Sequence, residues 1–170
     1  MTHHLLTIAR EAIRSGLDGR GEAASGAAGG SPPQGCFVSL KQRGRLRGCI
    51  GTLRPVEGSL EAEVAANAVA AATRDPRFPP LEPRELRELS ISIDLLEPPE
   101  PVADETALDP AVYGVIVRNG KRVGVLLPGI PAVTSAARQV TICREKAGIG
   151  PEEPVTLERF RVRRLHEEKE

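Results

Sequence analysis

The side chains most suited to chemistry stand in one stretch, Gly35 to Thr52, which reads GCFVSLKQRGRLRGCIGT. Its cysteine, Cys49, follows Arg47 by two residues and lies between Gly48 and Gly51. A nearby guanidinium favours a thiolate over a thiol, so Arg47 is expected to lower the pKa of Cys49. Glycines weaken a strand unless another backbone or a ligand approaches closely. The stretch therefore predicts a catalytic or small-ligand surface, whereas the structural interpretation is a half-buried cysteine beside solvated arginines.

A β-hairpin is expected to position these groups. Phe37 to Leu40 suits a strand, Arg43-Gly44 a turn, and Arg45 to Gly51 the returning strand. Side chains alternate between the two faces of a strand. Leu46 and Ile50 are therefore predicted to face the core, on the opposite side from two arginines and the thiol.

A helix after the hairpin brings two further polar side chains. It is expected to begin at a Ser59 cap and to run to about Thr73. Glu63 and Asn67 are four residues apart and share one helix face. They could hydrogen-bond a ligand at the Cys49 strand or form a solvent-facing polar pair.

The segment DPRFPP, residues 75–80, is predicted to be a rigid loop, because proline fixes φ and restricts the residue before it. Asp75 can turn or cap the chain, Arg77 can bind an anion, and Phe78 can anchor the loop by apolar contacts. A stiff loop that holds polar groups in place suits a binding site. The structural alternative is an Asp–Arg pair that only locks the turn.

These segments together resemble the AMMECR domain family, including its microbial AmmeMemoRadiSam system protein A group. The motifs are LRGCIGT at 46–52, the helix with AANAVAAA, and DPRFPPL at 75–81. GCFVSLK upstream and SISIDLLEPPEPV, REKAGI and ERFRV downstream extend the resemblance over nearly the whole chain, as a single domain at 1–170. The resemblance implies an α+β fold of antiparallel sheets with flanking helices. It also implies a larger and a smaller lobe, with the LRGCIG strand facing the cleft between them.

The family has no assigned biochemical activity, so the resemblance implies a site more firmly than a reaction. Memo-like and radical-SAM proteins of the same system are the partners that it implies. Cys49 is the candidate nucleophile or acid/base. The candidate ligand-binding residues are Arg47, Gly48, Gly51, Thr52, Glu63, Asn67, Asp75, Arg77 and Phe78.

Two functions remain open at this point. The first is an enzyme, or a component of an enzyme system, that acts on a small or nucleotide-like anionic substrate held by arginines. No histidine lies near the motif in sequence to serve as a base. The second is a non-catalytic module or subunit that binds RNA or a protein through the basic hairpin Lys41 to Arg47. No motif for a metal or a nucleotide cofactor is present in the sequence.

The composition limits the partners. The chain has 23 basic and 23 acidic side chains and a formal net charge of zero, which gives no global attraction to nucleic acid or acidic membranes. Three Phe, one Tyr and no Trp make a base-stacking platform unexpected. Three cysteines without a pairing framework favour a reducing compartment. With no signal-peptide pattern and no long apolar run, we expect a soluble, cytoplasmic protein.

The rest of the chain predicts the framework. We expect helices at Thr2 to Ser15 and at about Thr134 to Ala147, where Cys143 lies on the apolar stripe. We expect strands over 89–95 and in a hairpin around Asn119-Gly120, and a last strand over 155–165 that breaks near position 158.

Two segments are expected to lack regular structure. They are the Gly-, Ala- and Ser-rich stretch 19–33, predicted to be flexible, and the charged tail 166–170, predicted to fray. His3 and His4 should be solvated at a helix start, and no metal site with His166 is expected.

Overall fold

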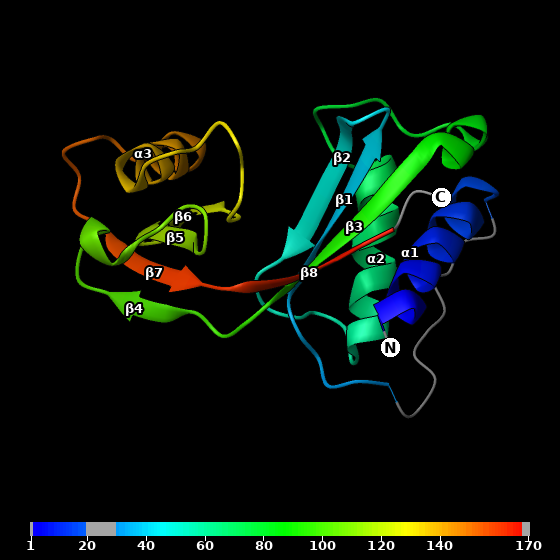
Figure 1. Cartoon of the computed structure of the whole chain (residues 1–170), viewed down its shortest axis with the longest axis horizontal. Coiled ribbons are helices and arrows are strands. Elements are labelled where there is room, and N and C mark those ends of the chain that lie inside the picture. Colours follow the sequence, from blue (N-terminus) through cyan, green and yellow to red (C-terminus); the bar gives the residue numbers. More distant parts are fainter. Residues whose placement is uncertain (1, 20–29, 168–170) are drawn as a thin grey trace. The chain divides into compact units, whose positions relative to one another are not determined.

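The computed structural model describes residues 2–19 and 30–167, which form two compact units (Figure 1). The larger, unit 1, consists of Met1–Leu95 and Arg163–Glu170, and the smaller, unit 2, is the intervening Leu96–Val162. Each unit has its own four-stranded sheet and its own hydrophobic core. The predicted α+β class is confirmed. None of the helices in the described ranges is long and apolar enough to cross a membrane.

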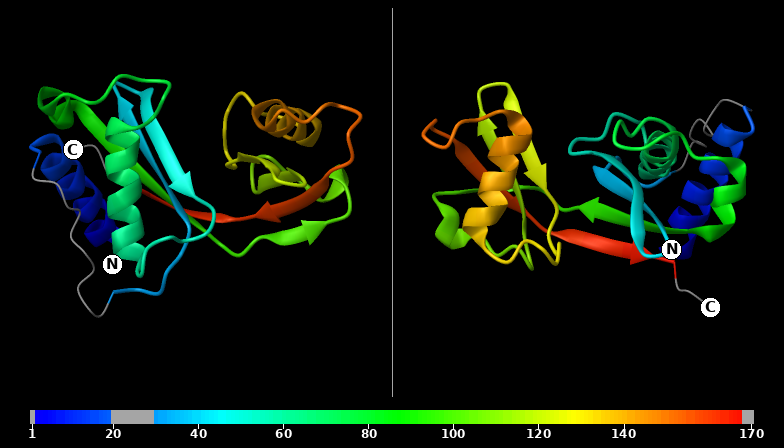
Figure 2. Two further views of the ribbon diagram at one scale, coloured as in Figure 1. Left: turned by 180° about the vertical axis from the view of Figure 1, so that it is seen from behind. Right: turned by 90° about the horizontal axis from the view of Figure 1, so that it is seen from above.

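Unit 1 is a sheet covered on one face by two helices (Figure 2). Its strand order is β2-β1-β3-β8. The strands are β1 (Cys36–Gln42), β2 (Arg45–Thr52), β3 (Leu89–Leu96) and β8 (Val162–His166). The helices are α1 (Thr2–Leu17) and α2 (Leu60–Thr73), and a short 3₁₀ helix, η1 (Pro83–Glu88), precedes β3.

The helices of unit 1 form where the sequence predicts them. The Ser59 hydroxyl caps α2 by accepting the Ala62 N–H at 3.2 Å. The alanine-rich face of α2 lets it lie close to the strands, where Val64 and Ala68 are fully buried. On α1, the period of apolar residues that begins at Leu5 faces the same core.

Unit 2 is a second antiparallel sheet with one helix. Its strand order is β4-β7-β5-β6. The strands are β4 (Glu100–Val102), β5 (Gly114–Asn119), β6 (Arg122–Leu126) and β7 (Thr156–Phe160). The helix α3 (Ala136–Ala147) packs on β5 and β6, and η2 (Glu105–Ala107) is a single 3₁₀ turn.

Two predicted hairpin turns are confirmed by backbone angles. Arg43 and Gly44 both have positive φ, 51° and 79°, as a type I′ hairpin turn requires. Gly120 has φ 58° in the turn between β5 and β6. Gly148 ends α3 in the left-handed conformation.

Pro101 lies in the short strand β4, which is an edge strand and therefore tolerates a missing N–H. One prediction about the strands is wrong. The last strand breaks at Arg161, not near Glu158, because β7 and β8 belong to different sheets.

The predicted flexible stretch 19–33 lies mostly outside the described residues, which resume at position 30. At that end it is anchored, since Ser31 donates its N–H and its hydroxyl to the Glu61 carboxylate at 2.8 and 2.9 Å. The predicted frayed tail is also held at its start. Glu167 receives two hydrogen bonds from Arg10, at 2.8 and 2.7 Å, which tie it to α1. Residues 168–170 lie outside the described part.

Candidate functional site

A β-bulge at Arg47 divides β2 into two registers with β1. Gly48 lies opposite Leu40, but Leu46 lies opposite Lys41, so Arg47 is the extra residue. Residues directly opposite share a face of the sheet. Leu46 therefore lies on the face of Lys41 and is 40% exposed. The prediction that Leu46 points to the core is wrong, because the extra residue reverses the alternation.

Cys49 lies on the sheet face turned away from the helices. It is opposite Ser39, and Ser39 is opposite Ser92 on β3. The neighbours of Ser39 along β1, Val38 and Leu40, point the other way into the core shared with α1 and α2. Cys49 therefore begins a line of small polar side chains. Neither serine is distinguished as a site residue by the sequence alone.

The Cys49 thiol is not activated in the way that the sequence predicts. Burial raises its pKa, and the Ser39 hydroxyl, which donates to Sγ at 3.2 Å, and the Arg77 cation offset only part of this. Arg47 is engaged elsewhere, with two hydrogen bonds to the Glu85 carboxylate at 2.9 and 3.1 Å. The expectation that Arg47 lowers the pKa of Cys49 is therefore wrong, and the neutral thiol is the favoured form at pH 7.

The DPRFPP loop is attached to the main chain of Cys49. Asp75 accepts the Cys49 N–H at 2.9 Å, and Arg77 Nη2 donates to the Cys49 carbonyl at 3.4 Å. Arg77 also donates to Asp75 through Nε and Nη2, at 3.0 and 2.8 Å. The hydrogen bonds from Arg77 hold the pKa of Asp75 well below its usual range. The pair locks the loop to the edge of the sheet.

The lock leaves part of Arg77 accessible. Its side chain is 56% exposed, against 2% for Asp75. Arg77 Nη1 makes no hydrogen bond among the described residues. Its guanidinium carbon lies 5.5 Å from the centre of the Phe78 ring, so the ring supports the arginine.

A second buried carboxylate with an exposed arginine lies across the sheet. Arg164 on β8 donates to both oxygens of Asp94 on β3, at 2.6 and 2.9 Å. The Asp94 side chain is 4% exposed and that of Arg164 is 45% exposed. Hydrogen bonding to Asp94 raises the pKa of Arg164. Neither residue is distinguished as a site residue by the sequence alone, although Asp94 continues the polar positions of its strand.

Three predicted ligand-binding residues lie on the other face of the sheet. Buried Glu63 accepts a hydrogen bond from the Thr52 hydroxyl and two from backbone N–H groups of the loop 53–58. Asn67 Nδ2 donates to Thr52 Oγ1 and to the Cys36 carbonyl, each at 3.1 Å. Glu63 and Asn67 are therefore neither beside the Cys49 thiol nor facing solvent. They hold the end of β2 and the following loop.

The two glycines next to Cys49 are explained by contacts within the protein. A Cβ on Gly48 would lie 2.2 Å from the Ala71 carbonyl oxygen of α2. A Cβ on Gly51 would lie 2.3 Å from the Phe37 ring. The close approach that glycine permits is thus made by a helix and by an aromatic ring. Neither position requires a ligand to explain it.

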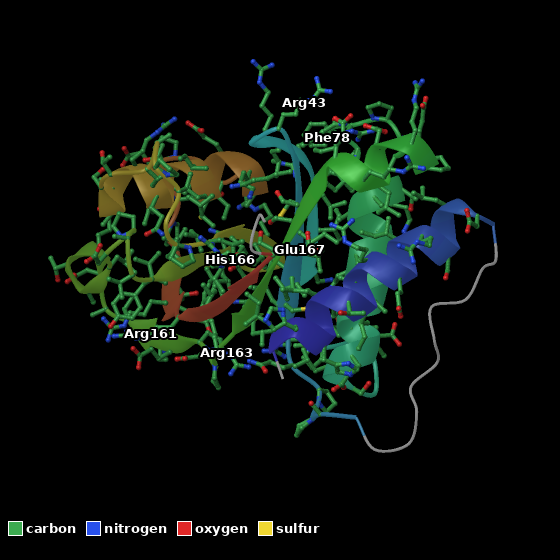
Figure 3. All side chains as sticks on the ribbon, turned by 45° about the vertical axis from the view of Figure 1, so that its right-hand side comes forward. Arg43, Phe78, Arg161, Arg163, His166 and Glu167 are labelled. Carbon is green, nitrogen blue, oxygen red and sulfur yellow. The ribbon has the colours of Figure 1, made fainter. Side chains whose placement is uncertain are left out.

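The tip of the basic hairpin borders a groove of about 1120 Å³ in unit 1. Its lining includes four arginines, three glutamates and the apolar Leu46, Phe78, Pro79 and Pro80. Figure 3 labels Arg43 and Phe78 among these side chains. Three ion pairs join the charged groups: Arg43 with Glu88, Arg47 with Glu85, and Arg84 with Glu82. The hairpin is therefore not the strongly positive surface that its sequence suggests.

The other cysteines belong to the two cores. Burial raises the pKa of Cys36 to about 11 and that of Cys143 to about 12. Both are free thiols. Within the part of the chain that the structure describes, no group of three His, Cys, Asp or Glu side chains could hold a metal ion.

Comparison with known proteins decides the family. The AMMECR1 family pattern matches residues 6–165. The chain belongs to the AMMECR1 family. A Thermotoga maritima protein is 51% identical over 133 residues, which cover 76% of each chain. The crystal structure of an uncharacterized protein from Pyrococcus horikoshii has a TM-score of 0.88 and 27% identity, and the match covers 97% of this chain and 90% of that one.

These AMMECR1 relatives establish a fold and a family but not an activity. A Clostridium acetobutylicum protein is 44% identical over 134 residues, yet this chain covers only 28% of its length. In that relative the AMMECR1 domain is one part of a longer protein.

Proposed function

We propose that this AMMECR1 domain binds a small anionic substrate on the polar face of the β2-β1-β3-β8 sheet, around Cys49, and takes part in its conversion. The observation that carries this proposal is the position of the thiol between two ion pairs, Asp75–Arg77 and Asp94–Arg164. In each pair the carboxylate is buried and the guanidinium is partly exposed. Each arginine is thus held by its carboxylate and is partly exposed, which is how an anion site is preorganised.

The role that suits Cys49 is that of an acid. A neutral thiol can donate a proton or a hydrogen bond to negative charge that develops on a bound substrate. A nucleophilic role would first require a base to remove the proton. Ser39 assists the donation of the proton, because its hydroxyl stabilises the negative charge that is left on Sγ.

The groove at the hairpin tip supports a second candidate, a binding module for a partner protein. Its exposed Leu46 and prolines offer apolar contact, whereas its three ion pairs offset the charge that RNA phosphates would need. From the family resemblance we also propose that Memo-like and radical-SAM proteins are the partners. Three free cysteines support a reducing, cytoplasmic location.

The anion site is tested with inorganic phosphate and adenosine monophosphate as probes. In a Cys36→Ala/Cys143→Ala background, either probe should slow alkylation of Cys49. Arg77→Gln should abolish most of this protection. Arg138→Gln is the control, because it changes an exposed arginine of α3 in unit 2. Equal alkylation with and without both probes would sink the proposal.

A further inference from the structure

Two independent contacts fix the register in which β8 pairs with β3. Arg164 forms its ion pair with Asp94. Glu167 follows Arg164 by three residues, and Ile91 precedes Asp94 by three residues on β3. The Glu167 N–H donates to the Ile91 carbonyl at 3.1 Å. Both contacts fit the same antiparallel register, which places His166 opposite Ser92.

His166 lies on the polar face. Leu165 before it is buried in the core, and Glu167 after it is bonded to Arg10 on α1, so both point to the helix side. Alternation along the strand sends Arg164 and His166 to the opposite side, and His166 is exposed. Figure 3 labels His166 and Glu167 at the end of β8.

The sheet therefore aligns four polar side chains in one row, which we call the polar row. Its members are Cys49, Ser39, Ser92 and His166, one from each strand in the order β2-β1-β3-β8. Neighbouring strands lie about 4.8 Å apart, so the row spans about 14 Å. That is the length of a nucleotide or of an extended acid with two charged ends.

Cations stand at both ends of the polar row. Arg77 is hydrogen-bonded to the main chain of Cys49 at one end. At the other end Arg164 lies two residues from His166 on the same face of β8. The middle of the row holds only the hydroxyls of Ser39 and Ser92, which can both donate and accept hydrogen bonds.

We propose that the polar row binds one elongated dianion, with one anionic group at Arg77 and the other at Arg164 and His166. This rests on the proposed function and extends the anion site from Cys49 to the far edge of the sheet. Each arginine is already paired with an aspartate, so the ligand is recognised by directed N–H groups more than by net charge. Polar atoms between the charged ends of the ligand bond the two serines.

The test measures both ends of the row in the full chain. The probes are linear dicarboxylates of increasing length, from succinate to dodecanedioate, together with adenosine diphosphate. Cys49 alkylation in the Cys36→Ala/Cys143→Ala background reports one end. The imidazole NMR signals of His166, assigned with His166→Gln, report the other. His3→Gln is the matched control, since His3 is an exposed histidine on α1.

A long dianion should protect Cys49 and shift the His166 signals with the same dissociation constant. His166→Ala should weaken its binding at least fivefold and leave binding of inorganic phosphate unchanged, and His166→Gln should restore part of the loss. If phosphate protects Cys49 but no dianion shifts the NMR signals of His166, the dianion proposal is wrong and the proposed function stands. If no probe protects Cys49, both are wrong.

Discussion

In its protonation state, the Cys49 side chain differs from a catalytic cysteine that reacts as a thiolate. The residue is partly buried, its sulfur accepts a hydrogen bond from the Ser39 hydroxyl, and the cation that lowers its pKa is Arg77 of the loop. Burial outweighs both stabilising contacts. Chemistry at this residue therefore starts from a protonated sulfur.

The pH profile of thiol modification follows directly. Because the pKa of Cys49 is raised, the thiolate fraction at pH 7 is smaller than that of a free cysteine, whose pKa is about 8.5. With Cys36 and Cys143 changed to Ala, the rate with a chromophoric disulfide should still be rising with pH where an ordinary free cysteine approaches its plateau. Ser39→Ala should slow the reaction further. A plateau reached below pH 8 would contradict the assignment.

At the scale of elements, the approach of α2 to β2 depends on Gly48. Ala at this position would place Cβ 2.2 Å from a backbone oxygen of the helix, and backbone cannot move aside as a flexible side chain can. We expect Gly48→Ala to lower the free energy of unfolding by about 2 kcal/mol or more, measured by urea denaturation.

Gly58→Ala is the matched control, because a Cβ there meets nothing within 4 Å. It should change stability by less than about 0.5 kcal/mol. Equal effects of the two substitutions would mean that helix packing does not explain Gly48. Close approach of a ligand would then be the better explanation for that glycine.

The elements could be predicted well from the sequence, but the faces of the site could not. Turn residues and apolar periods predict the hairpins and helices, since they depend on local backbone preference. The bulge at Arg47 is set by pairing with β1 and inverts Leu46, which alternation alone does not reveal. Glu63 and Asn67 share a helix face as predicted, but only the packing of α2 shows which side of β2 they meet.

Cys49 and His166 show a second reason why the site could not be predicted from the sequence. His166 lies 117 positions after Cys49, and the two meet in one row only because β8 returns to the sheet of β1 and β2. Such a long-range pairing leaves no local signal. No histidine lies near the motif in sequence, although the sheet supplies His166 at its other edge.

At the scale of the whole molecule, unit 2 is a continuous segment inserted between β3 and β8. Its core includes the buried Val115, Val117 and Leu157, and its two ends are joined by the Glu97 N–H to the Arg161 carbonyl at 2.9 Å. A segment that is closed at its ends and has its own core should fold without the rest of the chain.

We therefore expect the fragment 96–162 to unfold cooperatively on heating, followed by circular dichroism, with a stability of a few kcal/mol. Val117→Ala should lower its midpoint, since Val117 is fully buried. A fragment with no cooperative transition, or one indifferent to this substitution, would show that unit 2 depends on unit 1.

The attachment of Asp75 and Arg77 to Cys49 also bears on solubility. β2 is an edge strand, and an open edge offers N–H and C=O groups that can recruit a strand from another molecule and start aggregation. The two side chains occupy one N–H and one C=O in the middle of that edge. A second chain can extend the sheet at Cys49 only by first displacing Asp75 and Arg77 from its main chain, so the pair that holds the loop also protects the sheet against intermolecular β-pairing.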